Sequence, residues 1–274
     1  MKFTRVISSL VISVLITFNF SFGQNGSTSP FKLDFTKEAI LLGSGAAVGA
    51  TALLIISNLD PLTMEQINDL NPDDVNSFDK HFIGTLHPDH AGDILLAGSY
   101  LLPLTFLAVD DTRKDFWDLG LMYGEVLLIN AGLTGIVKGT VTRIRPFAYD
   151  SNTPIEKKTD TDARVSFYSG HTSFTASACF FTAKVFSEYL TDNTAKILIW
   201  SAAAIYPAVS GILRVNSHSH FPTDVIVGYI AGAAIGYLIP ELHKSNKENN
   251  ISLQSSGNLH NPVLSIQIKS LFVM

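Results

Sequence analysis

The chain has 274 residues, of which 46% are hydrophobic and 16% are charged, and its formal net charge is -5. This length allows one large domain or two small ones, and the charged fraction is low for a soluble protein. Without a basic face to neutralise a run of phosphates, a nucleic-acid partner is excluded. Cys179 is the only cysteine, which excludes an intrachain disulfide and a cysteine metal cluster.

The N-terminus, residues 1–23, is typical of a secretory signal peptide. Lys2 and Arg5 precede an uncharged run over 6–20, and small residues follow at the positions that cleavage requires. An uncleaved signal anchor is the competing interpretation, for which the apolar run is near the short limit of a membrane span. Residues 24–37 are rich in Gly, Ser, Thr and Pro and are predicted to form a linker.

Six helices are predicted after the linker, at about 38–58, 92–109, 116–137, 171–190, 195–213 and 223–240. Their Gly and Ala content favours close packing, and the spacing of Gly43, Gly45 and Gly49 in the first would let helix backbones approach each other. No strand alternation precedes the extreme C-terminus. We therefore predict an all-α fold, a helical bundle of about six core helices over residues 38–243, with the site at one end.

The connections between these helices carry two ambiguous segments. An acidic loop from Asp60 to Asp89 ends in a run of His, Pro and Asp that could suggest a metal site, although Pro and Asp also start helices. Residues 147–164 are predicted to form a polar loop, either a substrate-selecting lid or a solvated connection. The tail, 244–274, is polar, and alternation over 263–269 predicts a short strand, with a disordered tail as the alternative.

Eight residues that could bind a phosphate or take part in catalysis fall into three blocks in the second half of the chain. They are Lys138, Arg145, Ser169, Gly170, His171, Arg214, His220 and Asp224.

Each block supplies something that phosphoester cleavage needs. Lys138, Arg145 and Arg214 provide three cations, two of them guanidinium forks that grip phosphate oxygens through paired hydrogen bonds. Gly170 lets backbone N–H groups approach a phosphate closely, and a helix over 172–182 would add the partial positive charge of its N-terminus.

The three blocks resemble the signature motifs of the type 2 phosphatidic acid phosphatase superfamily, which also contains bacterial acid phosphatases and vanadium haloperoxidases. The resemblance covers roughly residues 90–240 and departs from the family at Tyr168, where the second motif usually opens with Pro. It implies a phosphatase that needs no metal or other cofactor. The residues implied as catalytic are His220, His171 and Asp224, and those implied as phosphate-binding are Lys138, Arg145, Arg214, Ser169 and Gly170.

The residue types also allow separate catalytic roles to be assigned. We expect His220 to be the nucleophile that forms a phosphohistidine, because Asp224 lies four residues on and can hold its Nδ1–H. His171 would protonate the leaving oxygen and then activate water. Pro146 is predicted to end the third helix and so to direct Arg145. Two further residues near the motifs, Arg143 and His218, are interpreted as supporting or surface residues.

Membrane association decides between two substrate classes. Uncharged runs within four of the helices are 16 to 21 residues long, against about 20 needed to span a bilayer. An integral bundle would hydrolyse a phosphomonoester or pyrophosphate of a lipid, which we favour. A bundle outside the membrane would act on small soluble phosphomonoesters, and a vanadium haloperoxidase is the third alternative, although members of that class are generally larger.

The charged residues inside the helices and the placement of basic residues bear on topology. Glu125, Lys184 and Glu188 must face protein or water if their helices are embedded. A cleaved signal would put the site loop in the cytoplasm if three helices cross before it, whereas Lys and Arg residues opposite the site favour that opposite side as cytoplasmic. We expect an exported protein, membrane-associated or integral to the inner membrane, with its site on the periplasmic side.

Overall fold

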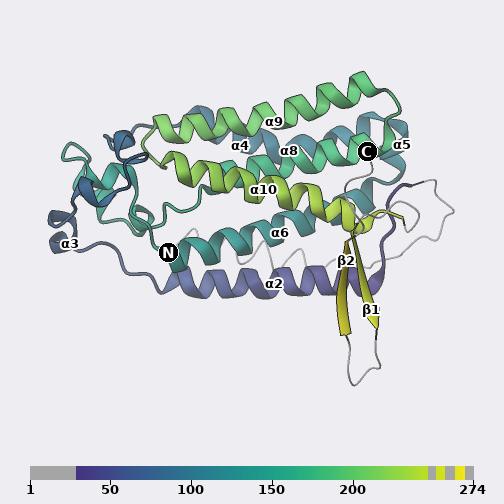
Figure 1. Cartoon of the computed structure of the whole chain (residues 1–274), viewed down its shortest axis with the longest axis horizontal. Helices are drawn as coiled ribbons and strands as arrows, with labels where there is room; N and C mark the ends of the chain where they lie inside the picture. The colour runs from purple at the N-terminus through teal and green to yellow at the C-terminus, as the bar shows by residue number, and fades with distance from the viewer. Residues whose placement is uncertain (1–28, 246–250, 257–262, 269–274) are drawn as a thin grey trace.

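The computed structural model describes residues 29–245 together with the backbone of 251–256 and 263–268. Residues 29–245 form an all-α bundle, as predicted, and its long helices match the six expected segments (Figure 1). These are α2 (Phe35–Ser57), α4 (His90–Leu101), α6 (Phe116–Val141), α8 (Gly170–Tyr189), α9 (Asn193–Asn216) and α10 (Pro222–His243). The proposed signal peptide and the start of the linker lie outside the described residues.

Shorter elements lie between the long helices, in the predicted loops and, for η3, within the second predicted helix. Before α6 these are α3 (Met64–Asn68), η1 (Pro72–Asp74), η2 (Lys80–Phe82), η3 (Leu102–Ala108) and α5 (Asp110–Lys114). Between α6 and α8 they are η4 (Pro146–Tyr149), α7 (Ile155–Lys158) and η5 (Thr161–Arg164). Strands β1 (Ile251–Ser256) and β2 (Val263–Ile268) pair antiparallel outside the bundle, with Ile251 opposite Ile268.

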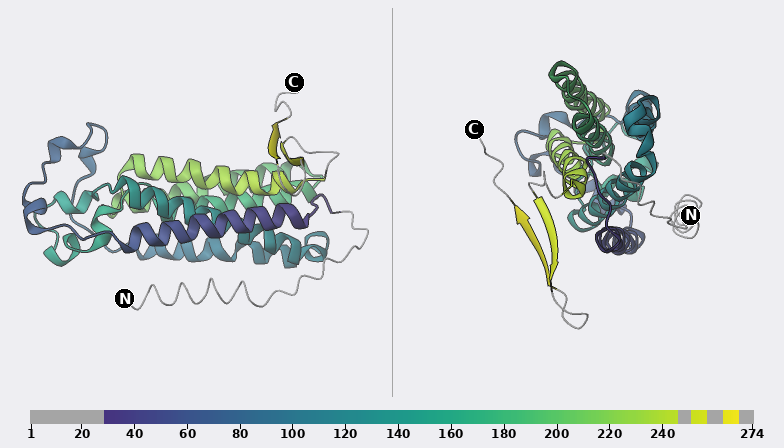
Figure 2. Two further views of the ribbon diagram at one scale, coloured as in Figure 1. Left: turned by 90° about the horizontal axis from the view of Figure 1, so that it is seen from below. Right: turned by 90° about the vertical axis from the view of Figure 1, so that its right-hand side faces the viewer.

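The chain runs back and forth along one axis. Helices α2, α6 and α9 run toward the end that carries α3, while α4, α8 and α10 run away from it (Figure 1). Helix α8 packs against α4, α6, α9 and α10, whereas α2 packs mainly on α6 at the edge of the bundle (Figure 2). This alternation brings the loops before α4, α8 and α10 together at one end.

Two helix ends differ from the prediction. Helix α6 extends past Lys138 to Val141 and stops at Thr142, whose φ of 47° is left-handed and whose N–H bonds to the Lys138 carbonyl at 3.2 Å. Pro146 therefore does not end this helix and instead begins η4. The predicted second helix is also split, because α4 gives way to the 3₁₀ helix η3, which carries Pro103 in its first turn.

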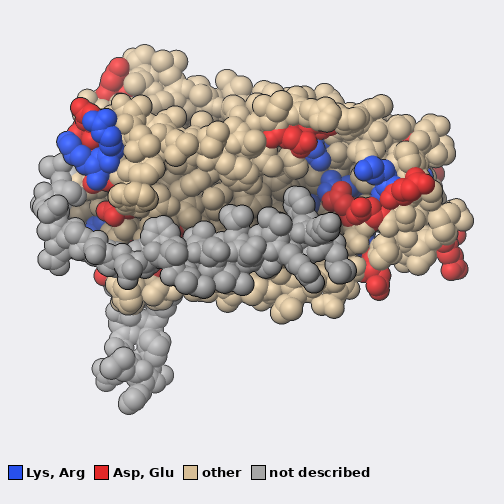
Figure 3. All heavy atoms as spheres, turned by 180° about the vertical axis from the view of Figure 1, so that it is seen from behind, with Lys and Arg blue, Asp and Glu red and all other residues tan. Residues whose placement is uncertain are grey.

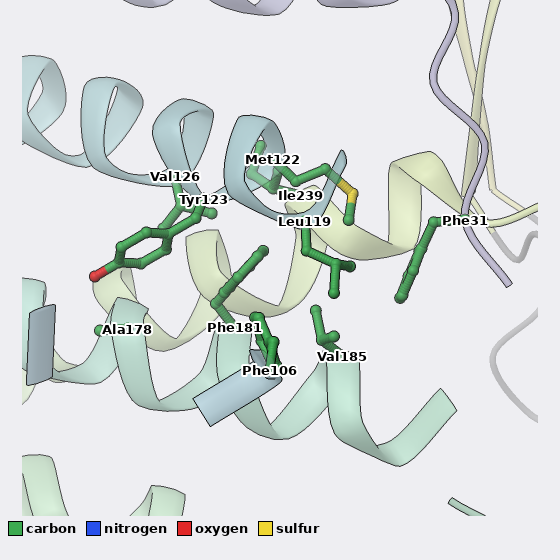
Figure 4. Packing of buried hydrophobic residues seen from close by; sticks show 10 residues of the cluster. All are labelled: Phe31, Phe106, Leu119, Met122, Tyr123, Val126, Ala178, Phe181, Val185 and Ile239. Carbon is green, nitrogen blue, oxygen red and sulfur yellow. The ribbon is translucent and has the colours of Figure 1, made fainter. Parts of the chain in front are cut away.

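The largest apolar core lies between α6, α8 and α10, toward the end opposite α3. Figure 4 shows aromatic and aliphatic side chains from these helices and from η3 converging there. The cluster consists of Phe31, Phe106, Leu119, Met122, Tyr123, Val126, Ala178, Phe181, Val185 and Ile239. Burying each large side chain contributes roughly 1.5–3 kcal/mol, so this cluster fixes how α6, α8 and α10 pack together.

Glycines set how closely the helices approach, at one of the three predicted positions and at several others. A Cβ on Gly45 would lie 3.0 Å from the Leu128 side chain, so this glycine lets α2 pack closely on α6. A Cβ on Gly43 would meet nothing within 4 Å and one on Gly49 would have only an ordinary contact, so these two do not enforce close packing in α2. On α10, a Cβ on Gly228, Gly232 or Gly236 would fall 2.5, 2.0 or 2.3 Å from a backbone carbonyl oxygen of α8. The α8–α10 interface therefore depends on hydrogen as the side chain at these three positions.

The outer faces of the bundle are apolar. Five described helical segments are long and apolar enough to cross a membrane, and only 17–44% of the apolar window of each is buried. Large side chains such as Leu54, Ile94, Trp117, Ile197 and Ile230 are 62–76% exposed on these faces. Figure 3 shows the charged groups toward the two ends of the face in view, with an uncharged belt between them. Such a surface is more stable in contact with lipid than with water, so the bundle is suited to integration in a membrane.

The charged residues within the helices turn inward, as predicted. Glu125 is fully buried in α6, and Lys184 is 5% exposed in α8. Lys184 Nζ lies 2.6 Å from Glu188 Oε1 and 2.7 Å from Glu241 Oε2, so its charge is paired inside the bundle.

Candidate active site

All eight motif residues gather at the end of the bundle that carries α3 (Figure 1). Lys138 is in the last turn of α6, Arg145 directly precedes η4, and Arg214 is in the last turn of α9. Residues 169–171 form the start of α8, and His220 and Asp224 flank the start of α10. The alternating direction of the helices therefore assembles one site from three distant blocks.

His220 is fully enclosed within a group of cations. Its side chain is 2% exposed, and its Nε2 lies 3.0 Å from Nη1 of Arg145. Burial, and after it the positive charges of Arg145, Lys138 and Arg214, lowers the pKa of His220 well below its ordinary 6.5. The ring is therefore held neutral, with a lone pair available on one nitrogen.

Asp224 lies close to His220 without a hydrogen bond to it. The distance from His220 Nδ1 to Asp224 Oδ2 is 3.7 Å, too long for a hydrogen bond. That carboxylate oxygen instead accepts from Ser166 Oγ at 2.5 Å and from the Phe221 N–H at 2.9 Å. The contact expected between Asp224 and the Nδ1–H is thus electrostatic in this structure, and Asp224 is held by the turn that carries His220.

Arg143 fixes the other oxygen of Asp224. Its Nη1 lies 2.6 Å from Asp224 Oδ1 and its Nη2 lies 2.8 Å from Asp79 Oδ2. Both carboxylates are fully buried, and Asp79 also accepts from the Thr223 hydroxyl at 2.5 Å. Arg143 therefore links the acidic loop to the start of α10, a role that its place outside the motif positions did not indicate.

Arg145 is held on several sides. Its Nε donates to the Asp162 carbonyl at 2.8 Å, its Nη2 to Asp162 Oδ1 at 2.7 Å, and its Nη1 to the Ser219 carbonyl at 2.7 Å. Asp162 lies in η5, within the segment predicted to be a polar loop. This segment is thus an ordered support for the guanidinium, and Asp162 was not predicted as a site residue.

Ser169 begins α8 as its N-cap residue. Its hydroxyl accepts from the Thr172 N–H at 3.4 Å, and its own N–H donates to the Asp224 carbonyl at 3.0 Å. The N–H of Ser169 is therefore occupied, whereas its hydroxyl lies 3.0 Å from Thr172 Oγ1, and either of these two oxygens can be the donor. The N–H groups of Gly170 and His171 are in the first turn of α8, where a helix has no internal acceptors for them.

Two acidic residues at the start of α4, its N-cap residue Asp89 and Asp93, contact Arg214 and His171. His171 Nε2 lies 2.9 Å from Asp93 Oδ1, and Arg214 Nη1 lies 3.2 Å from Asp89 Oδ2. Burial and the Arg214 charge lower the pKa of His171, against the opposing effect of Asp93. Lys138 Nζ donates to the Val165 carbonyl.

Tyr168 occupies the place where the second motif usually has Pro. Its side chain is 4% exposed, and its hydroxyl accepts a hydrogen bond from Thr134 Oγ1 at 3.1 Å. This residue therefore links the start of α8 to α6.

Comparisons with known proteins identify the domain that contains this site. Residues 119–248 match the model of the PAP2 superfamily, and all eight motif residues fall within that range. The matched domain belongs to the PAP2 superfamily. The three sequence motifs resemble this same superfamily, so the match to the family model confirms the resemblance. The supporting acidic residues Asp79, Asp89 and Asp93 lie before the matched range.

Curated relatives match a shorter stretch of the PAP2 domain. The chain is 38% identical over 84 residues to mouse (Mus musculus) phospholipid phosphatase 2 and 32% identical over 81 residues to mouse phospholipid phosphatase 1. Each match covers 28% of this chain and 29% of the relative, so the chain spans less than a third of the length of these relatives.

A solved structure also matches this chain. The transmembrane PAP2 type phosphatidylglycerolphosphate phosphatase of Bacillus subtilis is 20% identical, with a TM-score of 0.41, over 75% of this chain and 91% of that one.

Proposed function

We propose that this PAP2 protein hydrolyses a phosphomonoester or pyrophosphate of a lipid, through a phosphohistidine on His220 and without a metal ion in the reaction. The observation that carries the proposal is the buried, neutral His220 beside Arg145, within reach of the charges of Lys138 and Arg214. A binding protein would need the cations alone. A neutral imidazole buried among cations is suited to attack a bound phosphate.

In the first step, the lone pair of His220 Nε2 forms a bond to phosphorus as the bond to the leaving oxygen breaks. Protonated His171 gives its proton to that oxygen, so the alcohol leaves neutral. The cations and the N–H groups at the start of α8 stabilise the charge that develops on the phosphoryl oxygens. Arg145 already faces Nε2 at 3.0 Å, which places one phosphate-binding group directly beside the attacking atom.

In the second step, neutral His171 takes a proton from water, and the resulting hydroxide oxygen attacks phosphorus. The bond from phosphorus to Nε2 breaks, inorganic phosphate leaves, and both histidines return to their starting protonation states. Asp224 stabilises the positive charge on the His220 ring while the phosphohistidine exists, across the 3.7 Å that separates their nearest atoms.

An apolar groove beside the site supports a lipid substrate. It has a volume of about 450 Å³ and lies between α9 and α10, directly beside the turn that carries His220. Its lining includes Ile212, Val215, Val225 and Ile226. Such a groove suits the acyl or isoprenyl chain of a substrate whose phosphate lies at His220. The names of the mouse relatives, phospholipid phosphatases, agree with this substrate class.

The proposal includes a location for the site outside the cytoplasm. Outside the active site, four Lys and Arg residues lie at the site end, namely Lys80, Lys157, Lys158 and Arg164. Six lie in the loops and helix ends at the opposite end, namely Lys32, Lys37, Arg113, Lys114, Lys196 and Lys244. This small excess favours the opposite end as the cytoplasmic one. A reporter fused after residue 244 and a protease-sensitive tag within 147–164 should then report opposite sides of the membrane, and alkaline carbonate should leave the protein in the membrane. Tag cleavage from the cytoplasmic side alone would refute this location.

The activity is tested with purified protein in detergent. We expect phosphate release from p-nitrophenyl phosphate and, more efficiently, from short-chain phosphatidate, with the same initial rate after EDTA is added. His220→Ala should abolish release from both substrates, whereas His81→Ala, which alters an exposed histidine of η2, should not. Equal turnover by His220→Ala and the parent would refute the proposal. Preference for the soluble ester would favour an acid phosphatase instead.

The covalent intermediate has its own test. In His171→Ala the second step should be slow, so a ³²P-labelled substrate quenched in alkali should leave acid-labile label on the protein. The label should disappear when His220→Ala is added to the same variant. Label that persists in the double variant would place the nucleophile elsewhere.

A further inference from the structure

A second cluster of titratable side chains lies at the opposite end of the bundle from the active site. Glu38 in the first turn of α2, Glu125 in α6 and His243 at the end of α10 are 3%, 0% and 1% exposed. His243 follows Asp224 by nineteen residues of α10, which is about 28 Å along the helix axis. The proposed phosphatase mechanism therefore does not use this cluster.

The three side chains point their ligand atoms at one another. His243 Nε2 lies 3.1 Å from both carboxylate oxygens of Glu38 and 3.3 Å from Oε2 of Glu125. One ligand atom from each residue can be chosen so that all three lie within 4.8 Å of one another. Two ligands bound at about 2.0–2.1 Å to a tetrahedral zinc ion are about 3.3 Å apart. The separations from Nε2 match that spacing.

The histidine is oriented as a metal ligand would be. His243 Nδ1 donates to the Ile239 carbonyl at 2.7 Å, which fixes the proton on Nδ1 in the neutral ring and leaves the Nε2 lone pair facing the carboxylates. Glu38 Oε1 accepts from the Asp34 N–H at 3.2 Å. These contacts hold two of the three side chains from behind, an arrangement that is common around metal sites.

Glu125 supplies an independent sign that a ligand is needed. Both of its carboxylate oxygens are buried, and the groups that face them are the other two members of the cluster, His243 Nε2 at 3.3 Å and the Glu38 carboxylate. Two carboxylates that face each other in a buried site are costly unless a proton or a cation lies between them.

The basic residues at this end do not fill that need. Lys184 Nζ is engaged by Glu188 and Glu241, and Lys244 Nζ lies 3.2 Å from Glu188. Among the ion pairs of the described residues, none joins a lysine or arginine to Glu38 or Glu125. Two buried carboxylates therefore face a single imidazole.

We propose that Glu38, Glu125 and His243 bind a divalent transition-metal ion, with Zn²⁺ as the ion that suits two carboxylates and one imidazole in tetrahedral geometry. The ion would neutralise both carboxylates and tie the start of α2 to α6 and α10. Helix α2 packs mainly on α6, so this link would anchor the edge helix of the bundle. The ion takes no part in phosphate chemistry, and the proposal stands independently of the proposed function.

Zinc binding is measured on the full chain in detergent, after chelator treatment and dialysis against buffered Zn²⁺, by elemental analysis. We expect about one zinc per chain in the parent and an affinity at least about tenfold weaker in Glu125→Gln, which keeps the size of the side chain. Glu188→Gln is the matched control, because it alters a neighbouring buried carboxylate outside the cluster, and it should bind like the parent. Zinc should raise the melting temperature of the parent and of this control only.

Three results would overturn the proposal: a parent that binds no more zinc than Glu125→Gln, equal loss of binding in Glu188→Gln, or a melting temperature that zinc leaves unchanged. A measurement on the parent covers the case in which Glu125→Gln does not fold. Co²⁺ added to the metal-free parent should give the intense visible absorption of a four-coordinate ion, and Zn²⁺ should abolish it. A spectrum no stronger than that of aqueous Co²⁺ would refute the site.

Discussion

Replacing Gly232 by alanine should destabilise the bundle far more than the same change at an open glycine. The Cβ of Gly232→Ala would lie 2.0 Å from the Ser173 carbonyl oxygen, about 1.4 Å less than the 3.4 Å at which ordinary contact begins. Because the obstacle is backbone, no side-chain rotation relieves it, and α8 and α10 must move apart. Overpacking of this kind costs about 1–3 kcal/mol, and we expect the upper part of that range.

Gly124→Ala is the matched control for this change. Gly124 is in α6, and a Cβ there meets nothing within 4 Å. The free energy of unfolding of Gly124→Ala should not fall, and it should rise by up to about 1 kcal/mol, the usual difference in helix propensity between glycine and alanine. Free energies of unfolding from SDS titration of both variants in mixed micelles measure the difference. Equal stability of Gly232→Ala and Gly124→Ala would refute the role assigned to the α8–α10 contact.

Gly228 connects the same contact to the active site. Its added Cβ would lie 2.5 Å from the Ser169 carbonyl oxygen, and the Ser169 N–H is the donor to Asp224 O. Displacement there should move Asp224 and His220 relative to the start of α8. A shift near 1 Å in a catalytic group costs on the order of 100-fold in rate, so Gly228→Ala should lose activity per folded molecule, whereas Gly232→Ala should lose mainly stability.

The mechanism makes four more predictions. His171→Ala should slow alkyl phosphates more than p-nitrophenyl phosphate, because a good leaving group needs no proton; an equal loss for both would exclude His171 as the acid. The pKa of His220 is lowered, so the neutral nucleophile persists as pH falls, and the acid limb of the kcat/KM profile should lie well below pH 6.5, after correction for substrate ionisation, while the alkaline limb reports loss of the proton from His171; an acid limb at or above 6.5 would contradict the buried neutral ring. Vanadate should inhibit competitively in the micromolar range or below by copying five-coordinate phosphorus, and purely non-competitive inhibition would place it elsewhere. Arg143→Lys, which cannot bridge two carboxylates, should lower kcat roughly tenfold or more with a smaller change in KM; loss confined to KM would make Arg143 a substrate ligand.

The sequence predicted that the motif residues would lie together at one end of the bundle, because their spacing along the chain reports helix ends. His220 and Asp224 are four residues apart at the start of one helix, and Ser169 to His171 form the start of another. Residues that are this close in sequence remain close in the folded chain. The helical segments were equally predictable, because long uncharged runs bounded by polar residues specify both the positions of the helices and their apolar surroundings.

The partners of those groups could not be predicted, because tertiary contacts select them. The acidic loop contains many carboxylates, and nothing in the sequence distinguishes Asp79, which binds Arg143, from Asp73, which pairs with Lys80 at the surface. The cluster of Glu38, Glu125 and His243 could not be predicted either, because up to 205 residues separate its members along the chain. The stop of α6 at Thr142 was missed because a left-handed threonine has no sequence signal comparable to glycine.

The carboxylates around the active site fall into two groups by burial, and this division suggests how a cation-rich site can be both paired and accessible. Asp79 and Asp224 are fully buried and hold Arg143 from two sides, and Asp89, which is 5% exposed, pairs with Arg214, so the charges of these three carboxylates are fixed parts of the scaffold. Asp93 and Asp162 are each 60% exposed and pair with His171 and Arg145. Because these two carboxylates reach water, the oxygens of an arriving phosphate can replace them on His171 and Arg145. In the proposed mechanism, the exposed acids keep these two groups oriented between turnovers, and the buried acids keep the rest of the site in place while the phosphate is bound.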